Sequence, residues 1–570
     1  MKFVYCKAEL GLLVGCILVS TSGIAVGQTT RVSVDSNGNQ GNAGSFLSAL
    51  SADARFVAFE SSATNLVTGD TNGFSDIFVR DRATGQTTRV SVDSSGTQAN
   101  DDSFNPAISA NGRFVAFASR ASNLVAGDTN ASGFPESDFD TFVHDRLTGQ
   151  TVRVNVDSAG QQANATDFPQ SPSLSADGRF VAFSSFASNL VAGDTNSTTD
   201  VFVRDLQTGQ TTRVSVDSNG VEGDRFSDVP SISTDGRYVA FRAAASNLVP
   251  GDTNFFCDRN GDGMFIDNCM DVFVHDRQTG QTTRVSVDSQ GTQGNSESYP
   301  GVYMAISADG RFVVFNSEST NLVPGDTNGI RDFFVHDRLT GETTRVSVDS
   351  AGNQATTVIF SGAGAAISAD GRFVAFEFDA SFVPEDTGIT TPDVDVYVHD
   401  RLTGETKLVS VDSAGNEGNR SSSTPSISAD GRFVSFVSFA DNLVPDDTNG
   451  AHDVFVHDNT INVTLQIGPS HSINPRSNGV LPVAILTTPA FDAASVDVSS
   501  VLFGSAGATE AHGTGHLQDV DGDGDVDLLL HFETPATGIA CGDTSASLTG
   551  QTVTSLPIIG SVTIVTVGCH

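Results

Sequence analysis

A nine-residue block, S-x-D-G-R-F-V-A-F or a close variant of it, occurs seven times along the 570-residue chain. Successive copies start 58 to 74 residues apart, and short β-branched and aromatic runs with Gly, Asn and Asp turns separate them. Such a period predicts an array of all-β repeats rather than a helical solenoid. The arginines of the seven copies are Arg55, Arg113, Arg179, Arg237, Arg311, Arg372 and Arg432.

Each repeat supplies four short segments with strand character. They are a P-x-I-S segment, the R-F-V-A-F block, a D-V-F-V-H-D block and a T-T-R-V-S-V-D block. Four-stranded units repeated around an axis form a β-propeller. We therefore expect an all-β protein with a seven-bladed β-propeller over residues 28–460, with its D-G and T-G-Q turns on one face and its long loops on the other.

The third repeat shows a family resemblance. The run from Ser175 to Phe183 and the run from Asp200 to Asp205 resemble the S-P-D-G-K-x-I-A-F and D-I-Y-V-M-D blocks of TolB-like, WD-type propeller repeats. The resemblance extends over about 430 residues and implies the propeller fold. It does not imply an activity, because such propellers serve in binding, as scaffolds and in enzymes.

The fourth-strand block begins at Thr29, before any complete repeat, whereas the last repeat ends at Asp458 without one. The N-terminal strand 29–36 is therefore expected to complete the seventh blade and to close the ring, which leaves no open sheet edge. Within each blade, the arginine that starts the second strand should meet the aspartate that ends the third. Arg179 and Asp205 are one such predicted pair.

Residues 1–27 have the pattern of a secretory signal peptide, with a charged start, an apolar run and the small residues Ala25-Val26-Gly27 before the cleavage point. In an alternative interpretation, Leu13 to Cys16 is a lipoprotein box and Cys16 is acylated. Both predict export to the periplasm, the cell surface or the medium. No other stretch approaches the ~20 apolar residues of a transmembrane segment.

Charge and cysteine content narrow the functional classes. The 30 Lys+Arg against 68 Asp+Glu give a net charge of -38, which excludes a nucleic-acid binder that relies on phosphate contacts.

Beyond the signal, four cysteines remain in two local pairs. In an exported protein this arrangement predicts the disulfides Cys257–Cys269 and Cys541–Cys569 rather than a metal site or a catalytic thiol.

Four long loops carry the pattern D-x-N-x-x-x-D, whose oxygen ligands suit calcium. In a second interpretation these side chains cap their own turns. We favour the turn interpretation, because the sixth repeat has Asp386-Thr387-Gly388 and lacks the asparagine. The four sets are Asp70, Asn72 and Asp76; Asp194, Asn196 and Asp200; Asp326, Asn328 and Asp332; and Asp447, Asn449 and Asp453.

The fourth repeat contains an insertion between Cys257 and Cys269. Its Asp258, Asn260 and Asp262 reproduce the first half of an EF-hand-type calcium loop, but Cys269 stands where the bidentate glutamate belongs. Calcium binding and a simple disulfide-linked acidic loop both fit this pattern.

The strongest metal signal lies near the C-terminus. Five carboxylates occur within nine residues there, and their mutual repulsion disfavours a compact loop unless a cation screens it. Leu530 at the EF-hand glutamate position favours a calcium-bound β-turn over a helix-loop-helix, with a solvated acidic turn as the alternative. His512 and His516 lie just upstream and could form a zinc site. We favour the alternative interpretation, that they are two polar histidines of a loop. The five carboxylates are Asp519, Asp521, Asp523, Asp525 and Asp527.

From about residue 463 the repeat pattern stops, and residues 463–570 read as a small β-sandwich-like domain held by Cys541–Cys569. Its S-I-N-P-x-S-x-G-x-x-P-V-A-I-L and D-V-D-G-D-G-D blocks resemble those of a C-terminal module found in exported bacterial proteins. The resemblance itself implies no particular activity, and we expect attachment or surface display as the role of this domain.

Five third-strand histidines suggest a catalytic ring, but Arg80 and Arg204 occupy the equivalent positions of two repeats. No hydrolase, zinc-protease or phosphate-loop motif accompanies them. We expect an exported, non-enzymatic propeller that binds a protein or a surface polymer on its long-loop face, with calcium-stabilised loops. The alternative is an extracellular hydrolase or lyase that acts on a polymer at the central channel. The histidines are His144, His275, His336, His399 and His457.

Overall fold

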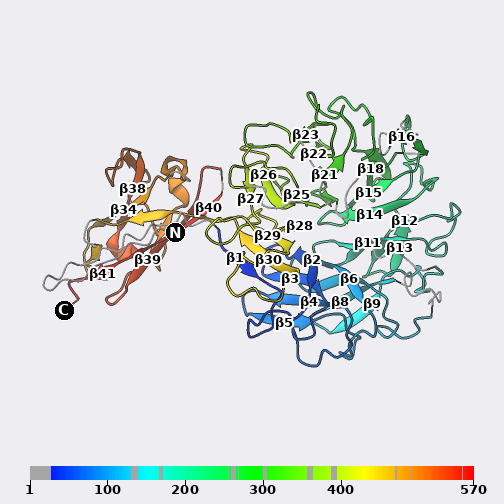
Figure 1. Ribbon diagram of the computed structural model, residues 1–570, viewed down its shortest axis with the longest axis horizontal. Helices are drawn as coiled ribbons and strands as arrows, with labels where there is room; N and C mark the ends of the chain where they lie inside the picture. Colours follow the sequence, from blue (N-terminus) through cyan, green and yellow to red (C-terminus); the bar gives the residue numbers. More distant parts are fainter. Residues whose placement is uncertain are drawn as a thin grey trace, which may run out of the picture.

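The computed structural model describes residues 27–129, 139–165, 171–253, 256–258, 265–267, 269–298, 304–355, 364–386, 394–468, 471–488, 491–554 and 556–569, without the side chains of 256–258 and 265–267. Nearly all of its regular structure is β-strand. The repeats form four-stranded antiparallel sheets arranged in a ring, and a further group of sheets follows them in the chain (Figure 1). The chain is an all-β protein built on a β-propeller.

Within the described residues the repeats form seven such sheets, which we call blades one to seven. Blade one contains β2 (Ser45–Leu50), β3 (Phe56–Ser61), β4 (Asp76–Asp81) and β5 (Gln86–Arg89). Blade two contains β6 (Ser103–Ile108), β7 (Phe114–Ser119), β8 (Asp140–Asp145) and β9 (Gln150–Arg153). Blade three contains β10 (Ser173–Leu174), β11 (Phe180–Ser185), β12 (Asp200–Asp205) and β13 (Gln210–Arg213).

Blade four contains β14 (Ser227–Ile232), β15 (Tyr238–Ala243), β18 (Asp271–Asp276) and β19 (Gln281–Arg284), and the hairpin β16 (Phe256–Asp258) and β17 (Phe265–Asp267) is inserted after β15. Blade five contains β20 (Ala305–Ile306), β21 (Phe312–Ser317), β22 (Asp332–Asp337) and β23 (Thr343–Arg345). Blade six contains β24 (Ala365–Ile367), β25 (Phe373–Phe378), β26 (Asp395–Asp400) and β27 (Thr406–Leu408). Blade seven contains β28 (Ser422–Ile427), β29 (Phe433–Ser438), β30 (Asp453–Asp458) and β1 (Thr29–Arg31).

Blade seven takes strands from both ends of the repeat region. β1 pairs antiparallel with β30, with Thr29 opposite His457. The strand ends at Arg31 rather than at residue 36, because Val34 leaves the sheet and forms an isolated bridge with Gln40. The Thr29 hydroxyl donates to the carbonyl of Val411 in blade six, so the seam between the last two blades is bridged by this first strand.

A circle of backbone hydrogen bonds joins the turns between first and second strands. The amide of Ala52 donates to the carbonyl of Ala110 at 3.0 Å, and the amide of Ala429 donates to the carbonyl of Ala52 at 2.9 Å. The bonds between these run in the same sense, so each blade is tied to the next. The circle passes through Ala52, Ala110, Ala176, Thr234, Ala308, Ala369 and Ala429.

The middle strands of each blade are the most buried. In blade one, Phe59 of β3 and Phe78 of β4 are fully buried and stack with ring centroids 5.8 Å apart. The blades also interlock through the D-G turn. Gly112 has a φ of 71° and lies against the Phe56 ring of the preceding blade, where a Cβ would come within 2.1 Å of the ring. Glycine is therefore required for both its backbone angle and its lack of a side chain.

The predicted arginine–aspartate pair between second and third strands is confirmed. In blade three, Arg179 Nε donates to Asp205 Oδ1 at 2.9 Å and Nη2 donates to Oδ2 at 2.7 Å. This contact holds the pKa of Asp205 well below its usual range. The same two bonds form between Arg55 and Asp81, Arg113 and Asp145, Arg237 and Asp276, Arg311 and Asp337, Arg372 and Asp400, and Arg432 and Asp458.

Residues 461–569, which we call the C-terminal module, form a β-sandwich with a core between its two larger sheets. The five-stranded sheet has the order β31 (Ile461–Asn462), β40 (Pro557–Thr563), β39 (Ser545–Gln551), β35 (Leu502–Phe503) and β36 (Ala508–Thr509). The four-stranded sheet has the order β32 (Thr464–Gln466), β34 (Val480–Leu486), β38 (Asp527–Glu533) and β37 (His516–Gln518). The smaller elements are β33 (Ser472–Ile473), β41 (Val565–Thr566) and the 3-10 helices η1 (Ala493–Ser495), η2 (Val498–Ser500) and η3 (Thr534–Thr537).

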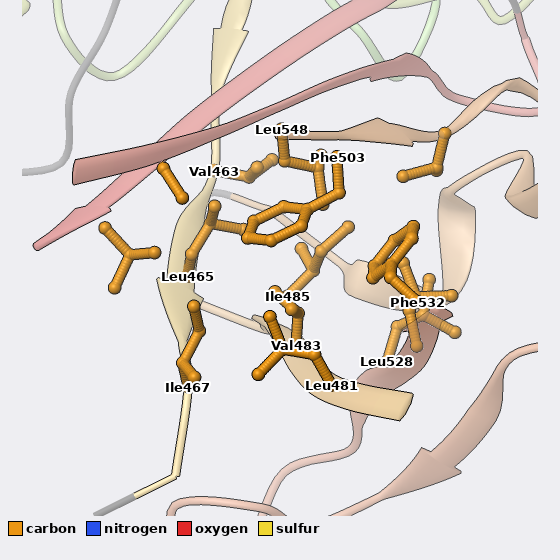
Figure 2. Close-up of a cluster of buried hydrophobic side chains, with 14 of the residues drawn as sticks. Val463, Leu465, Ile467, Leu481, Val483, Ile485, Phe503, Leu528, Phe532 and Leu548 are labelled. Atoms are coloured by element: carbon orange, nitrogen blue, oxygen red, sulfur yellow. The ribbon is translucent and has the colours of Figure 1, made fainter. Parts of the chain in front are cut away.

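Figure 2 shows the core of this module, in which Phe503 of one sheet stacks on Phe532 of the other with ring centroids 5.1 Å apart. Cys541 and Cys569 form a disulfide at its end. The module also contacts the propeller, where Arg372 of blade six donates to the carbonyl of Thr554. In the fourth blade, Cys269 is buried and disulfide-bonded, whereas the side chain of Cys257 lies outside the described residues.

Candidate functional site

The aspartates of the D-x-N loops contact an arginine of the fourth strand. In blade one, Arg89 Nη1 lies 3.0 Å from Asp70 Oδ1 and 3.1 Å from Asp76 Oδ2, and Asn72 Nδ2 donates to Asp76 Oδ2 at 3.0 Å. A guanidinium thus occupies the centre of the oxygen cluster that calcium would need, which supports the interpretation of these loops as turns. The equivalent arginines are Arg153, Arg213, Arg284, Arg345 and Arg31.

Blade three has the densest cluster of this kind. Arg213 Nη1 lies 3.5 Å from Asp194, 3.3 Å from Asp200 and 2.7 Å from Glu222. Burial raises the pKa of Asp194 to about 6, and the charge of Asp200 adds to this effect while Arg213 opposes it. One fixed cation contacts all three carboxylates and offsets their mutual repulsion in this mostly buried cluster.

Blade six departs from this arrangement. Leu408 stands opposite Tyr397, at the position where Arg89 stands opposite Phe78 in blade one. The Tyr397 hydroxyl donates to the Asp386 carboxylate, and its oxygen also lies 3.0 Å from the carbonyl oxygen of Ala380. Burial raises the pKa of this phenol well above its usual range. In this blade a neutral donor from the third strand contacts the loop aspartate, in place of a cation from the fourth.

The third-strand histidines are buried and contact threonines. His336 Nδ1 lies 2.9 Å from Thr343 Oγ1, and that hydroxyl donates to the carbonyl of Val287 in blade four. Since the hydroxyl proton is used there, the imidazole donates through Nδ1. Burial lowers the pKa of His336 to about 4, so the ring is neutral at pH 7.

Arginine replaces these histidines in blades one and three. Arg80 Nη1 donates to Thr87 Oγ1 at 3.0 Å and to the carbonyl of Gly85 at 2.6 Å. The threonine hydroxyl again donates to the preceding blade, at the carbonyl of Val34. Histidine and arginine therefore have the same structural role at this position: each contacts a threonine whose hydroxyl bonds to the preceding blade.

The acidic loop of residues 519–526 connects β37 to β38, with Gln518 paired to Asp527. One carboxylate oxygen each of Asp519, Asp521 and Asp527 lies within 4.8 Å of the other two. Asp523 and Asp525 lie outside this group of three. Desolvation raises the pKa of Asp525, and the charge of Asp523 adds to this effect. The loop joins two antiparallel strands, and Gly522 and Gly524 within it have positive φ angles.

Asp527 differs from the other four carboxylates because it is buried. Its Oδ1 accepts from the amide of Thr487 and its Oδ2 accepts from the amide of Val520, each at 2.8 Å. The exposed Asp519 and Asp521 instead accept amides within the loop itself, from Gly522 and Asp523. Asp527 thus fixes the base of the loop, and the exposed carboxylates can turn toward a cation.

The inserted hairpin of blade four places Asp258 at the end of β16, opposite Phe265 of β17. Asn260 and Asp262, which complete the predicted calcium loop, lie outside the described residues. The structure therefore locates the hairpin that would carry this site, and the calcium prediction for it stays a prediction.

Some second-strand positions differ from blade to blade. Glu60 of blade one is 7% exposed, accepts from Ser75 Oγ at 3.3 Å and has its pKa raised to about 7 by burial. At the same position in blade four, Arg242 pairs with Asp228 through two hydrogen bonds. Both residues lie near the strand ends that lead into the long loops, so this difference between blades lies at the long-loop end of the ring.

None of the helices formed by the described residues has the length and hydrophobicity that crossing a membrane requires. No protein-family model matches the sequence. A search of curated proteins also finds no match.

Solved structures that the fold is similar to include β-propeller proteins. TolB from Acinetobacter baumannii has 15% identity and a TM-score of 0.31, over 64% of this chain and 62% of that one. An oligogalacturonate lyase in complex with manganese has 12% identity and a TM-score of 0.43, over 76% and 93% of the two chains. The acylaminoacyl peptidase of Pyrococcus horikoshii has 12% identity and a TM-score of 0.41, over 79% and 59%. The chain thus spans less than two thirds of the length of that TolB.

Proposed function

We propose that this chain is an exported, non-enzymatic propeller that binds a protein or a surface polymer through its long-loop face. We define that face by the loops between second and third strands and the loops between blades, which lie opposite the circle of turn hydrogen bonds. One observation carries the proposal. The repeated Arg, Asp, His and Thr side chains bind one another within and between blades, so the ring is a rigid support for variable loops.

Exposed apolar side chains on this face supply contact area for a partner. Phe74 and Phe186 follow second strands and are 37% and 46% exposed, and Val221 in the loop between blades three and four is 53% exposed. The opposite face carries exposed leucines at its T-G turns, with Leu147 at 74% and Leu339 at 75%. The two sets allow one face to be tested against the other.

The binding test uses the labelled full chain and isolated cell-surface material. The double variant Phe74→Ser/Phe186→Ser should reduce the affinity by about tenfold or more. Two phenylalanines that become buried against the partner on binding together contribute more than about 1.4 kcal/mol. The matched variant Leu147→Ser/Leu339→Ser should bind as the unchanged chain does. The proposal fails if the leucine variant loses binding and the phenylalanine variant does not.

We further propose that calcium binds the acidic loop through Asp519, Asp521 and Asp527. Their clustered oxygens fit a hard cation with loose geometry. Calcium at 100 times its dissociation constant should stabilise the full chain by about 2.7 kcal/mol relative to chelator, measured by thermal unfolding. Asp519→Asn/Asp521→Asn should abolish this shift, while Glu533→Gln, an exposed change in the same module, should keep it. An equal shift in both variants would place the ion elsewhere.

The alternative, a hydrolase or lyase that acts on an extracellular polymer, has one observation in its favour. Glu60 is buried at the long-loop end of blade one with a pKa of about 7, which suits a general acid or base. If the chain cleaves a polymer, Glu60→Gln should remove the activity without changing the melting temperature. Turnover that is unaffected in this variant would discard Glu60 as the catalytic group.

A further inference from the structure

Three histidines of the C-terminal module lie together on the edge of its four-stranded sheet. His512 follows β36, His516 begins β37, and His531 lies within β38. One ring nitrogen of each lies within 4.8 Å of those of the other two. The ring centroids are 5.2 to 6.3 Å apart. His512 and His516 are exposed, so the group is open to solvent.

The strand register explains why His516 and His531 share a face. In β38, Leu528, Leu530 and Phe532 are buried, and Figure 2 shows Leu528 and Phe532 in the core. Because side chains alternate along a strand, His531 and its neighbour Leu529 point to the outer face. His516 pairs with Leu529 and therefore points the same way, diagonally across from His531.

A bulge in the edge chain brings in the third ring. Glu510 bridges to Phe532, while His516 pairs with Leu529, so the edge chain has three more residues than β38 between these two points. The extra residues carry the chain outward from the sheet and place the His512 ring 5.2 Å from that of His531. Neither strand pairing nor turn geometry alone would require three imidazoles to converge here.

Glu510 lies directly behind the group. It is 8% exposed, its Oε2 accepts from the amide of His512 at 2.6 Å and its Oε1 accepts from the amide of His531 at 3.2 Å. Its Oε1 also lies 3.5 Å from His512 Nδ1. The Nδ1 atom of His531 is buried and has no hydrogen-bond partner among the described residues. A carboxylate behind one imidazole and an unsatisfied nitrogen on another are features of a metal-binding arrangement.

We propose that His512, His516 and His531 bind one divalent transition metal ion, for which zinc is the best chemical match. Three imidazoles supply borderline nitrogen ligands, which zinc accepts and which calcium does not. Glu510 is the positioning residue that orients His512. Three protein ligands leave one tetrahedral position toward solvent, which water or a side chain of a bound partner fills.

The site is separate from the acidic loop in both ligand type and position. The loop offers exposed carboxylate oxygens, whereas the histidine group offers ring nitrogens from the bulge and the outer face of β38. Zinc binding should therefore persist when calcium is saturating. It should also persist in Asp519→Asn/Asp521→Asn.

The test is a competition titration of the full chain with Zn²⁺ against a chromogenic chelator, in saturating calcium, together with the visible spectrum after Co²⁺ addition. We expect one Zn²⁺ per chain and the strong absorption of tetrahedral Co²⁺. His516→Ala and His512→Ala change exposed residues, so both should fold and both should weaken binding by more than the ~10–100-fold that loss of an outer partner costs. Glu510→Gln should weaken it within that range.

His471→Asn is the matched control, because His471 is an exposed histidine of the same module with a φ of 49° that asparagine tolerates. It should leave Zn²⁺ affinity unchanged. The proposal is overturned if the unchanged chain binds no Zn²⁺ at micromolar concentration. It is also overturned if the His512, His516 and His471 variants all bind it as the unchanged chain does.

Discussion

Blade three and the C-terminal module each bring three carboxylates together. In blade three, Asp194, Asp200 and Glu222 surround Arg213, and every partner in the cluster belongs to the repeat itself. In the acidic loop, the described hydrogen bonds to Asp519 and Asp527 come from backbone amides. Carboxylate spacing alone therefore does not identify a cation site, because an arginine from a neighbouring strand can satisfy the same oxygens.

Histidines divide the two regions in the same way. The propeller holds His336 against a threonine in the interior, where burial keeps it neutral. The module gathers His512, His516 and His531 against one another at its surface. For carboxylates and histidines alike, the side chains of the repeat contact partners within the propeller, whereas those of the module cluster where solvent can reach them.

The largest effect is expected when the cation of blade three is removed. Arg213→Met leaves three carboxylates in a mostly buried volume without their partner, which should lower the free energy of unfolding by about 3 to 5 kcal/mol. Denaturant unfolding in chelator measures the loss. Added calcium should recover part of it, because the variant then has the same kind of oxygen cluster as the acidic loop.

Arg225→Met is the control for Arg213→Met, since it removes the same charge from an exposed position in the loop between blades three and four. Its stability should stay within about 0.5 kcal/mol of the unchanged chain. A loss as small in Arg213→Met would show that the arginine is not what allows the carboxylates to lie together.

A second change separates the structural aspartate of the acidic loop from the exposed ones. Asp527→Ala removes the acceptor of two backbone amides and should cost about 2 kcal/mol even in chelator, because hydrogen bonds to a charged group contribute about 1.5 to 3 kcal/mol. Asp521→Ala should cost little in chelator and lose only the calcium response. Thermal unfolding with and without calcium distinguishes the two, and equal losses in chelator would contradict the assignment.

A third change tests the neutral histidines. The pKa of His336 is lowered to about 4 in the folded state, so the unfolded chain binds more protons below about pH 6.5 and stability falls as the pH drops toward 4. Arginine, which blades one and three use, stays charged in both states. His336→Arg should therefore lose about 2 kcal/mol less stability between pH 7 and pH 4.5, measured by denaturant midpoints.

Raised carboxyl pKa values act in the opposite direction. Glu60, with a pKa of about 7, and Asp271, with a pKa of about 6, favour the folded state at low pH and lose that contribution as the pH rises. Comparing His336→Arg with the unchanged chain cancels this background, because both contain Glu60 and Asp271. A pH profile of His336→Arg identical to that of the unchanged chain would contradict the burial argument.

The elements of the propeller follow directly from the sequence pattern, because each strand is a short β-branched run with a turn on either side. The Arg179–Asp205 pair was also predictable, since antiparallel neighbours fix which strand ends meet. The role of Arg213 was not, because its partners come from a loop and a strand whose relative placement depends on the folded sheet. His531 required the register of β37 and β38, which a single sequence does not reveal.

The pairing of β1 with β30 also has a kinetic consequence. The hydroxyl of Thr29 contacts a histidine 428 residues later in the chain, so the completion of blade seven depends on contacts between its two most distant parts in sequence. Long-range contacts of this kind slow folding, because the loop must close before the contact stabilises it. The first strand is synthesised before the other strands of the ring and cannot pair with β30 until the last blade is made. Until then, the sheet edges of blades six and one that flank blade seven stay open to misassociation.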